Sequence, residues 1–470
     1  MTGSSVARAP LADADRLSLS AVPPSRIRGR FPPGANHPVR VGLRCDGVNW
    51  ATVPVAADPA GGAFTADLPF VSKVPADRTV RLEVLDGAAL LGNLDIAPET
   101  RRNGHGLDAR SVHAVYDRPM FSVPWMQFDG ARLRVSGSHL PPDGDPSRLS
   151  VRLDHGVAYT FEYPLRTPEF GHHFWYWPNG ELSSFILTID LPACRPGSDP
   201  FWFEFIYPGM DAALEEMPEA VRRARRRISI PSRLESAICF PRETDQLTRV
   251  QTWSSDQSVT MTGYSTFRTI EALFTHYGIR RRSGVEILDW GCGHGRVARH
   301  FIQAWPEACI SGADIDAENV GWCARHLDGR FVTVPLLPPT PLAEDRFDGI
   351  FGISVMTHLT AEAQDAWLAE IARLLKPEGV ALITFEGPAA TAFSSVFRSP
   401  DWWRALSSSG FDDSQHDPAL DGKIGDNSYY RNTHHTEQYT RDVWSRYLEI
   451  VDIIPSAIGY QDMAVLRRHA

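Results

Sequence analysis

Two kinds of hydrophobic pattern divide the chain. Before about residue 208, apolar and polar positions alternate in short runs, as in residues 39–45 and 79–85. After about residue 261, helical periods alternate with short, mainly apolar runs such as residues 285–288. Alternation at every second residue is typical of strands with one buried face, and apolar runs between helices are typical of a parallel sheet. The pattern therefore predicts an all-β first part and an α/β second part.

The first part is interpreted as two β-modules. Short alternating segments separated by Pro, Gly and Asp-Gly turns fill residues 21–100, and strand patterns return over residues 115–210 after a polar linker. We predict that both are small β-sandwiches, immunoglobulin-like in the loose architectural sense. Residues 1–20 are small and polar without a clear period, so we expect a flexible leader there.

Residues 211–260 are predicted to form a helical connector. Residues 211–227 place acidic side chains first and an arginine run last, an order that complements the helix dipole, and Pro218 should kink or restart the helix. The arginine run could bind phosphate or an anionic glycan, and a solvated helix end is the competing interpretation.

Residues 261–470 predict a doubly wound α/β domain. An amphipathic helix over residues 262–274 precedes the first strand, and Thr360 suits the N-cap of a later helix that ends near Leu375. The expected strands are residues 285–290, 309–314, 330–334, 347–354 and 379–386, followed by a terminal hairpin of residues 448–454 and 463–466. The predicted fold class is thus multidomain, with two β-sandwich modules followed by a Rossmann-like domain.

Charge and composition exclude several classes of function. The 470 residues include 47 basic and 57 acidic side chains, a formal charge of -10, which provides no electrostatic footprint for nucleic acid. No apolar run approaches the length of a transmembrane segment, and the N-terminal residues lack the apolar core of a signal peptide. We therefore expect a cytoplasmic protein.

The cysteines give no sign of a metal site or of a disulfide framework. They are scattered without Cys-x-x-Cys pairs, which fits reduced thiols, and the histidines near the C-terminus also lack metal-ligand spacing. The six cysteines are Cys45, Cys194, Cys239, Cys292, Cys309 and Cys323. No bound metal is expected.

Three glycines at alternate positions, Gly291, Gly293 and Gly295, lie between a predicted strand and a predicted helix. Glycines there lack the Cβ atoms that keep a ligand away from the backbone, and a helix N-terminus offers unpaired N–H groups. A dinucleotide fingerprint requires its last glycine at the position of Arg296, which disfavours a pyrophosphate ligand. We expect a different small polar ligand on this turn.

The residues from Asp289 to Gly295, Asp-Trp-Gly-Cys-Gly-His-Gly, resemble motif I of class I S-adenosylmethionine-dependent methyltransferases. Further phrases, Asp314-Ile-Asp, Phe347-Asp, Ser354-Val-Met-Thr-His-Leu and Leu375-Lys-Pro-Glu-Gly, are similar to the branch often found beside glycosyltransferases in bacterial surface-polysaccharide pathways. The resemblance covers roughly the C-terminal half of the chain. It implies S-adenosylmethionine as the cofactor and methyl transfer as the reaction.

The resemblance also implies roles for individual residues. The glycine loop is expected to pack against the methionine part of the cofactor, and Asp314 to accept its ribose hydroxyls. The segment before motif I commonly folds over the cofactor, which makes Tyr264 and Arg268 candidates. Many relatives bind adenine with Asp or Asn after the third strand; this chain has apolar residues there, with Leu336 as the candidate contact. The expected cofactor residues are Asp289, Gly291, Cys292, Gly293, Gly295, Asp314, Ile315, Leu336, Ser354, Tyr264 and Arg268.

Two residues are candidates for catalysis. Methyl transfer is an in-line displacement that depends mostly on alignment, but a hydroxyl acceptor must also lose its proton to a base. His358 follows the fourth strand, at the sheet edge where ligands of doubly wound folds bind, and the alternative is a histidine that only packs. Glu386, after the fifth strand, is the second candidate, with a structural role as its alternative. The insertion over residues 387–440 suits a lid that covers the substrate.

The leading hypothesis is O-methylation of a saccharide or a saccharide-linked intermediate, with a glycan or a partner protein bound by the β-modules. One alternative is a methyltransferase that acts on a natural-product small molecule or a protein side chain. The other is a non-catalytic scaffold protein that holds the cofactor without turnover. The sequence leaves the acceptor atom, the ligand of the modules and the oligomeric state open.

Overall fold

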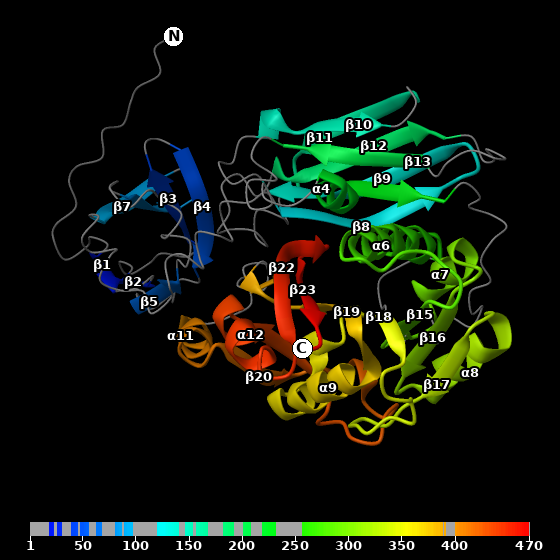
Figure 1. Cartoon of the computed structure of the whole chain (residues 1–470). Coiled ribbons are helices and arrows are strands. Elements are labelled where there is room, and N and C mark those ends of the chain that lie inside the picture. The colour runs from blue at the N-terminus through cyan, green and yellow to red at the C-terminus, as the bar shows by residue number, and fades with distance from the viewer. Residues whose placement is uncertain are drawn as a thin grey trace, which may run out of the picture.

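Figure 1 shows the computed structural model of the chain, with a sheet-rich N-terminal half and a mixed C-terminal half. The structure describes residues 18–22, 26–30, 39–45, 48–55, 63–67, 80–86, 89–96, 120–140, 146–153, 157–167, 182–191, 201–207, 219–231, 256–388, 390–391 and 400–469. Residues 1–17 of the expected leader lie outside these ranges, and β1 occupies its last three positions.

The first β-module contains seven described strands in two antiparallel sheets. One sheet has the order β1-β2-β5 and the other the order β4-β3-β6-β7. The strands are β1 (Ser18–Val22), β2 (Arg26–Arg30), β3 (Val39–Cys45), β4 (Val48–Val55), β5 (Ala63–Asp67), β6 (Val80–Asp86) and β7 (Ala89–Ile96).

The second β-module pairs a sheet of order β11-β12-β9-β8 with a sheet of order β10-β13-β14. Alternate residues of β12, among them Phe185 and Leu187, are buried in one cluster with Phe203 and Phe205 of β13. The two sheets therefore share a core, as the strand period requires. The strands are β8 (Met120–Phe128), β9 (Arg132–Leu140), β10 (Ser150–Leu153), β11 (Tyr159–Leu165), β12 (Ser184–Asp190), β13 (Phe201–Ile206) and β14 (Arg227–Ile230).

The connector differs from the helix expected over residues 211–260. Helix α4 (Glu219–Arg226) begins directly after Pro218, but residues 227–230 form β14 and pair with β13. Ile228 packs against the module core and Ile230 is buried in it, while Arg227 and Ser229 alternate with them. This period of two residues belongs to a strand. The remainder of the connector before residue 256 lies outside the described ranges.

Helix α6 (Asp256–His276) belongs to two cores. Met261, near its start, is fully buried in the core of the second β-module. Phe267 and Ile270, one to three turns later, are buried in the core of the C-terminal domain. The helix thus joins the two units, across the boundary that the sequence placed at residue 261.

The C-terminal domain has a seven-stranded sheet of order β17-β16-β15-β18-β19-β23-β22, in which β23 alone runs antiparallel to the other strands. The expected strands and terminal hairpin are confirmed, although β19 begins at Leu375, four residues before its predicted start. The strands are β15 (Glu286–Trp290), β16 (Cys309–Asp314), β17 (Arg330–Thr333), β18 (Phe347–Gly352), β19 (Leu375–Phe385), β22 (Glu449–Ile458) and β23 (Gln461–Arg467). This order confirms the Rossmann-like fold.

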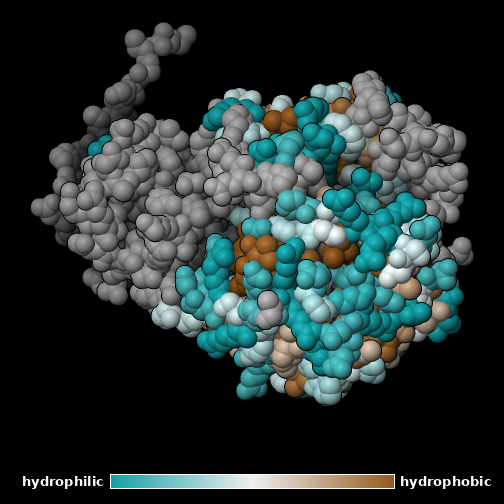
Figure 2. All heavy atoms as spheres, in the orientation of Figure 1, coloured by the Kyte–Doolittle hydropathy of each residue, from teal (hydrophilic) through white to brown (hydrophobic). Residues whose placement is uncertain are grey.

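Helices cover both faces of this sheet. One face packs against α6 and α7 (Ala298–Ala304), and the other against α9 (Ala361–Leu374), with α8 (Ala317–His326) beside β16 and β17. The Thr360 hydroxyl accepts a hydrogen bond from the Ala363 N–H at 3.3 Å, which confirms the predicted N-cap of α9. Figure 2 shows a mostly hydrophilic described surface on the viewed face, with hydrophobic residues gathered in the region of β22 and β23.

The insertion after β19 folds beside the carboxyl edge of the sheet. Tyr430 forms an isolated β-bridge with Leu359, next to the short 3-10 helix η7 (Met356–His358). The described elements of the insertion are α11 (Pro400–Ser409), β20 (Phe411–His416), η9 (Pro418–Leu420) and β21 (Arg431–His435), and α12 (Glu437–Trp444) follows β21. Among all the described helices, none combines the length and the apolar character that crossing a membrane requires.

Candidate cofactor and acceptor site

The glycine turn after β15 adopts a backbone conformation that residues with a Cβ atom rarely adopt. Gly291, Gly293 and Gly295 have φ values of 74°, 51° and 73°, all in the left-handed region. A Cβ at Gly291 would collide with Val355, and one at Gly295 would lie 2.6 Å from Leu327, so packing excludes larger residues there. A Cβ at Gly293 would meet no atom within 4 Å. The turn therefore leaves open space beside Gly293.

Two carboxylates, the buried Asp289 and the half-buried Asp314, hold this turn in place. Asp289 accepts a hydrogen bond from the Ala298 N–H at 3.2 Å, which ties the end of β15 to the start of α7. Asp314 accepts from the Gly293 N–H at 2.7 Å with one oxygen and from the Asp316 N–H at 2.8 Å with the other. Burial raises the pKa of Asp289 to about 7 and also raises the pKa of Asp314. Both acids position backbone, and Asp314 joins the turns after β15 and β16.

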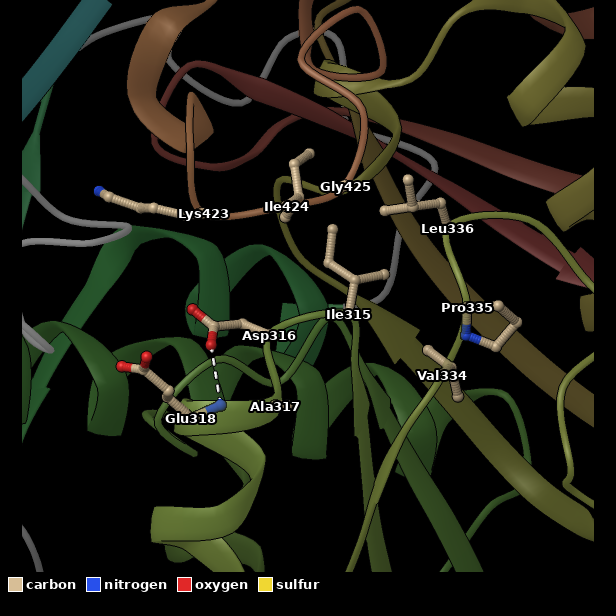
Figure 3. Close-up of a pocket in the computed structure, with 10 residues that line it drawn as sticks. All are labelled: Ile315, Asp316, Ala317, Glu318, Val334, Pro335, Leu336, Lys423, Ile424 and Gly425. Carbon is tan, nitrogen blue, oxygen red and sulfur yellow. Dashed lines mark hydrogen bonds between the residues drawn. The ribbon is translucent and has the colours of Figure 1, made fainter.

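A cavity of about 360 Å³ lies beside these turns, where β16 and β17 end. Figure 3 shows Ile315, Leu336 and Ile424 pointing toward one another across it, while Asp316 and Glu318 lie at one side. The lining residues are Ile315, Asp316, Ala317, Glu318, Val334, Pro335, Leu336, Lys423, Ile424 and Gly425. Two of the expected cofactor residues, Ile315 and Leu336, therefore face each other.

The insertion supplies the outer wall of this cavity through residues 423–425. The Trp367 indole N–H on α9 lies 3.0 Å from the Leu336 carbonyl and 3.1 Å from the Tyr429 hydroxyl. One donor thus contacts both the loop after β17 and the loop that carries Ile424. This shared contact holds the two walls of the cavity together.

The cavity fits S-adenosylmethionine. Its apolar walls at Ile315, Leu336 and Ile424 suit an adenine ring. The open space at Gly293 allows a ligand to approach the backbone, and each Asp314 oxygen still has a second lone pair for a hydroxyl donor. Of the expected cofactor residues, Ile315 and Leu336 line this cavity, and their contacts with the cofactor stay predictions.

The other expected cofactor residues lie around the turn rather than along the cavity. The Cys292 thiol contacts the Gly293 carbonyl at 3.7 Å, and the Tyr264 ring packs edge-on against His300 at 5.2 Å. Arg268 forms an ion pair with Glu271 of the same helix at 3.4 Å. Ser354, with a φ of 59°, contacts Thr384 and Gln461 through its N–H and its hydroxyl. Their roles in cofactor binding remain predictions.

His358 is held with one ring nitrogen engaged. Its Nδ1 lies 2.9 Å from the Arg431 carbonyl oxygen, and because a carbonyl can only accept, Nδ1 carries the proton. The Asp417 carboxylate lies 3.7 Å from the same nitrogen. Burial lowers the pKa of His358, which favours the neutral ring. Nε2 of this tautomer therefore keeps a lone pair that can accept a proton.

Glu386 lies at the end of β19, the strand next to β18, so it shares a sheet edge with His358. Its carboxylate is 3.1 Å from Nε2 of His434, a histidine with only 1% of its side chain exposed. Burial and the negative charge of Glu386 raise the pKa of Tyr460 to about 12. This carboxylate thus has a buried histidine beside it and acts on the charge state of an exposed tyrosine.

Tyr430 connects the cofactor and acceptor candidates. Its ring stacks on His358 with centroids 4.1 Å apart and an angle of 15° between the planes. Burial raises the pKa of Tyr430, and the carboxylates of Asp417, Asp314 and Glu386 raise it further. Tyr430 of the insertion is therefore in direct contact with His358, and its hydroxyl responds to the charges of Asp314 and Glu386.

Sequence reasoning assigned no site role to several residues that build this site. Trp367 lies within α9, where an apolar position indicates only packing, and Ile424 lies in the insertion without any motif around it. Asp316 was visible two positions after the ribose candidate, and its carboxylate caps α8 by accepting the Glu318 N–H at 3.0 Å. The aromatic pair Tyr429 and Tyr430 can be recognised in the sequence of the insertion, but it does not predict the contact of Tyr430 with His358.

Comparisons with known proteins agree with this geometry. A family model described as a methyltransferase domain matches residues 287–379. The chain is 30% identical to the cyclopropane-fatty-acyl-phospholipid synthase of Escherichia coli K12 over 105 residues. This matched segment covers 22% of this chain and 27% of that protein. It is 28% identical to a fatty-acid O-methyltransferase of Mycolicibacterium smegmatis over 125 residues. This second segment covers 26% of this chain and 42% of that protein.

A solved structure has a similar partial match. The 1,6-didemethyltoxoflavin-N1-methyltransferase of Burkholderia thailandensis, with S-adenosylhomocysteine bound, shares 18% identity and a TM-score of 0.30, over 50% of this chain and 93% of that one. The chain spans less than half of the two curated relatives it matches. The family match confirms a methyltransferase domain within the C-terminal half and supports S-adenosylmethionine as its cofactor.

Proposed function

We propose that this protein is a methyltransferase that transfers a methyl group from S-adenosylmethionine to a hydroxyl oxygen, with His358 as the base. The observation that carries the proposal is the ring of His358, whose protonated Nδ1 is held by the Arg431 carbonyl while Nε2 keeps its lone pair. When bound, S-adenosylmethionine supplies a methyl group activated by its positively charged sulfur.

The residues of this chain would then act in a defined order. The turn at Gly293 and the walls at Ile315 and Leu336 bind and orient the cofactor, and residues 423–425 exclude water from it. The acceptor hydroxyl loses its proton to Nε2 of His358 as the new bond from oxygen to carbon forms. The Arg431 carbonyl stabilises the resulting imidazolium through Nδ1, as the neighbouring Asp417 carboxylate also does.

A saccharide or a saccharide-linked intermediate is the acceptor that we favour. The Glu386 carboxylate at the same sheet edge can accept hydrogen bonds from neighbouring sugar hydroxyls. It also repels an acceptor that is itself a carboxylate, since two negative charges about 4 Å apart cost about 4 kcal/mol at an effective dielectric constant near 20. Hydroxyl-rich neutral ligands are therefore favoured over free acids.

A fatty-acyl acceptor is the second candidate. It is favoured by the names of the two curated relatives, a cyclopropane-fatty-acyl-phospholipid synthase and a fatty-acid O-methyltransferase, although each match covers less than half of the relative. The two candidate acceptors predict opposite effects of replacing Glu386. Replacing this carboxylate by glutamine should weaken transfer to a sugar hydroxyl but strengthen transfer to a fatty acid.

Transfer of a labelled methyl group separates these candidates. The full chain with S-adenosylmethionine is incubated with saccharides, lipid-linked saccharides and free fatty acids, and the label is followed into each. We expect a labelled saccharide, loss of most transfer in His358→Ala, and unchanged cofactor binding of that variant by calorimetry. Label in fatty acids alone would replace the saccharide assignment, and cofactor binding without transfer to any acceptor would favour a scaffold protein.

A further inference from the structure

One loop of the insertion contacts both parts of the candidate site. Residues 417–430 connect β20 to β21, and the two ends of this loop meet where the Asp417 N–H donates to the Tyr430 carbonyl at 3.1 Å. We call residues 417–430 the closing loop. Its residues 423–425 line the cofactor cavity, where Ile424 points toward Ile315 (Figure 3). Its last residue, Tyr430, stacks on His358, so a single segment of chain reaches the cavity and the proposed base.

The closing loop is held together by its own hydrogen bonds. The Gly422 N–H donates to the side-chain oxygen of Asn427 at 3.1 Å. The Lys423 ammonium donates to the Ala419 carbonyl at 2.9 Å. Compact surface loops whose ends meet are stabilised from within in this way. The internal bonds do not depend on the rest of the domain, so the loop can move as a unit.

Few side chains of the closing loop are anchored in the domain. Residues 421–428 are exposed except for Ile424, which packs against the domain core beside the cavity. Leu420 and Tyr429, on either side of this stretch, are buried. Segments with few buried contacts open most readily, so opening would release residues 421–428 first. A ligand in the cavity adds contacts at Ile424 and therefore favours the docked loop.

We propose that binding of the cofactor closes this loop, and that closure holds His358 in position for catalysis. The inference rests on the proposed role of His358 as the base. The docked loop places the Tyr430 ring 4.1 Å from the imidazole, centre to centre, and the Asp417 carboxylate 3.7 Å from Nδ1. Arg431, directly after the loop, provides the carbonyl that Nδ1 contacts at 2.9 Å. Tyr430 and Asp417 are thus positioning residues.

Closure gives the reaction an order. The cofactor binds first and stabilises the docked loop through Ile424. The docked loop then fixes the ring of His358, so that the base is in place only when a methyl group is available. A fixed loop is the competing description, in which the contacts of His358 are the same with and without the cofactor. The two descriptions differ in how the loop and the ring respond to a ligand in the cavity.

Hydrogen exchange of the full chain, with and without saturating S-adenosylhomocysteine, tests closure. We expect the ligand to slow exchange of the amides in residues 418–430 about fivefold or more, because it stabilises the docked loop. Ile424→Ala should lose most of this slowing, since its shorter side chain makes fewer contacts with the ligand. The matched control is Leu337→Ala, which should keep the slowing. Leu337 follows the cavity residue Leu336 but is 50% exposed and lies outside the loop.

The pKa of His358 tests the link between the loop and the base. Nuclear magnetic resonance of labelled histidines measures it, and the signal is identified by its loss in His358→Gln. Asp417→Asn should lower this pKa, because the carboxylate that favours the imidazolium is removed. Asparagine keeps an oxygen that can accept the Ala419 N–H, which Asp417 binds at 2.9 Å.

The lowering of the pKa by Asp417→Asn should be larger with S-adenosylhomocysteine bound than without it. Only the closed loop keeps the side chain of residue 417 beside the imidazole. Any direct effect of the ligand on the ring is common to the natural chain and the variant, so it cancels in this comparison. Equal lowering in the two states would overturn the link to the base.

Closure itself would be overturned by equal exchange with and without the ligand, by full slowing in Ile424→Ala, or by loss of slowing in Leu337→Ala. Circular dichroism checks the fold of each variant, and Ile424→Val, with partial loss of slowing expected, replaces Ile424→Ala if that variant does not fold. No acceptor is used in these measurements. A chain that closes but transfers no methyl group would therefore contradict the proposed function alone, whereas failure to bind S-adenosylhomocysteine would reject both.

Discussion

At the scale of single residues, the cofactor side of the site depends on backbone conformation and the acceptor side on side-chain chemistry. Gly291 and Gly295 leave no room for a Cβ, and Asp314 acts through the backbone groups it holds. His358 and Glu386, in contrast, offer a lone pair and a charge at the sheet edge. Substitutions at the two sides should therefore have separable effects on binding and on turnover.

Replacement of Asp314 by alanine should weaken binding of S-adenosylmethionine about tenfold or more. The substitution removes the acceptor of the Gly293 and Asp316 N–H groups, each worth about 1 kcal/mol or more, together with the expected ribose contact. Calorimetry measures the change, and Asp442→Ala on the exposed face of α12 serves as control. Unchanged affinity in Asp314→Ala would reject the ribose assignment.

The rate of methyl transfer should fall at acidic pH because His358, the proposed base, must be neutral to accept a proton. Burial lowers its pKa, so the fall should occur below the ordinary histidine value of about 6.5. The lowered pKa also means that His358 binds a proton more readily in the unfolded chain than in the folded one. The free energy of unfolding should therefore decrease as the pH falls below about 6.5. A profile of kcat/KM against pH measures the effect, and an identical acid limb in His358→Gln would contradict the assignment.

At the scale of elements, the close packing of α6 on the backbone just after the glycine turn depends on a glycine in the helix. Its Gly263 lies against the Arg296 backbone, and an added Cβ would be 2.6 Å from the Arg296 carbonyl oxygen. The sequence predicted this helix and its apolar face from a local period. It could not predict which residue touches the turn, because that depends on how two separate elements pack.

Substitution of Gly263 by alanine should therefore destabilise the protein by about 1–3 kcal/mol and weaken cofactor binding, since α6 must move away from the turn. The matched control is Gly321→Ala in α8, where the nearest atom is a flexible arginine nitrogen at 3.4 Å. That change should stabilise the helix by up to about 1 kcal/mol. Urea unfolding measures both, and stabilisation by Gly263→Ala would contradict the close contact.

At the scale of the whole molecule, the second β-module and the C-terminal domain share α6 and should unfold together. Met261 is fully buried in the module core, while Phe267 of the same helix is buried in the core of the domain. The two units are therefore coupled by packing rather than by a bare linker. The pattern of the sequence, which changes period near residue 261, located the change of fold but not this coupling.

Replacement of Met261 by alanine should lower the free energy of unfolding by about 2–5 kcal/mol, because it leaves a cavity in a well-packed core. Residues of α6 are buried in both cores. We therefore expect the unfolding transitions measured by tryptophan fluorescence and by circular dichroism to shift together. Two separate transitions, with only the earlier one moved, would show that the module and the domain are independent.

The sequence by itself determined the local features of this protein: the strand and helix periods, the Thr360 cap, the glycine turn and the acid at Asp314. Each is set by a few neighbouring residues, so its pattern can be recognised along the chain. Only the tertiary structure decided that Ile424 faces Ile315, that Tyr430 stacks on His358 and that Arg152 and Arg227 meet at Glu204. These contacts join residues far apart in the chain, and long-range packing leaves no local signal.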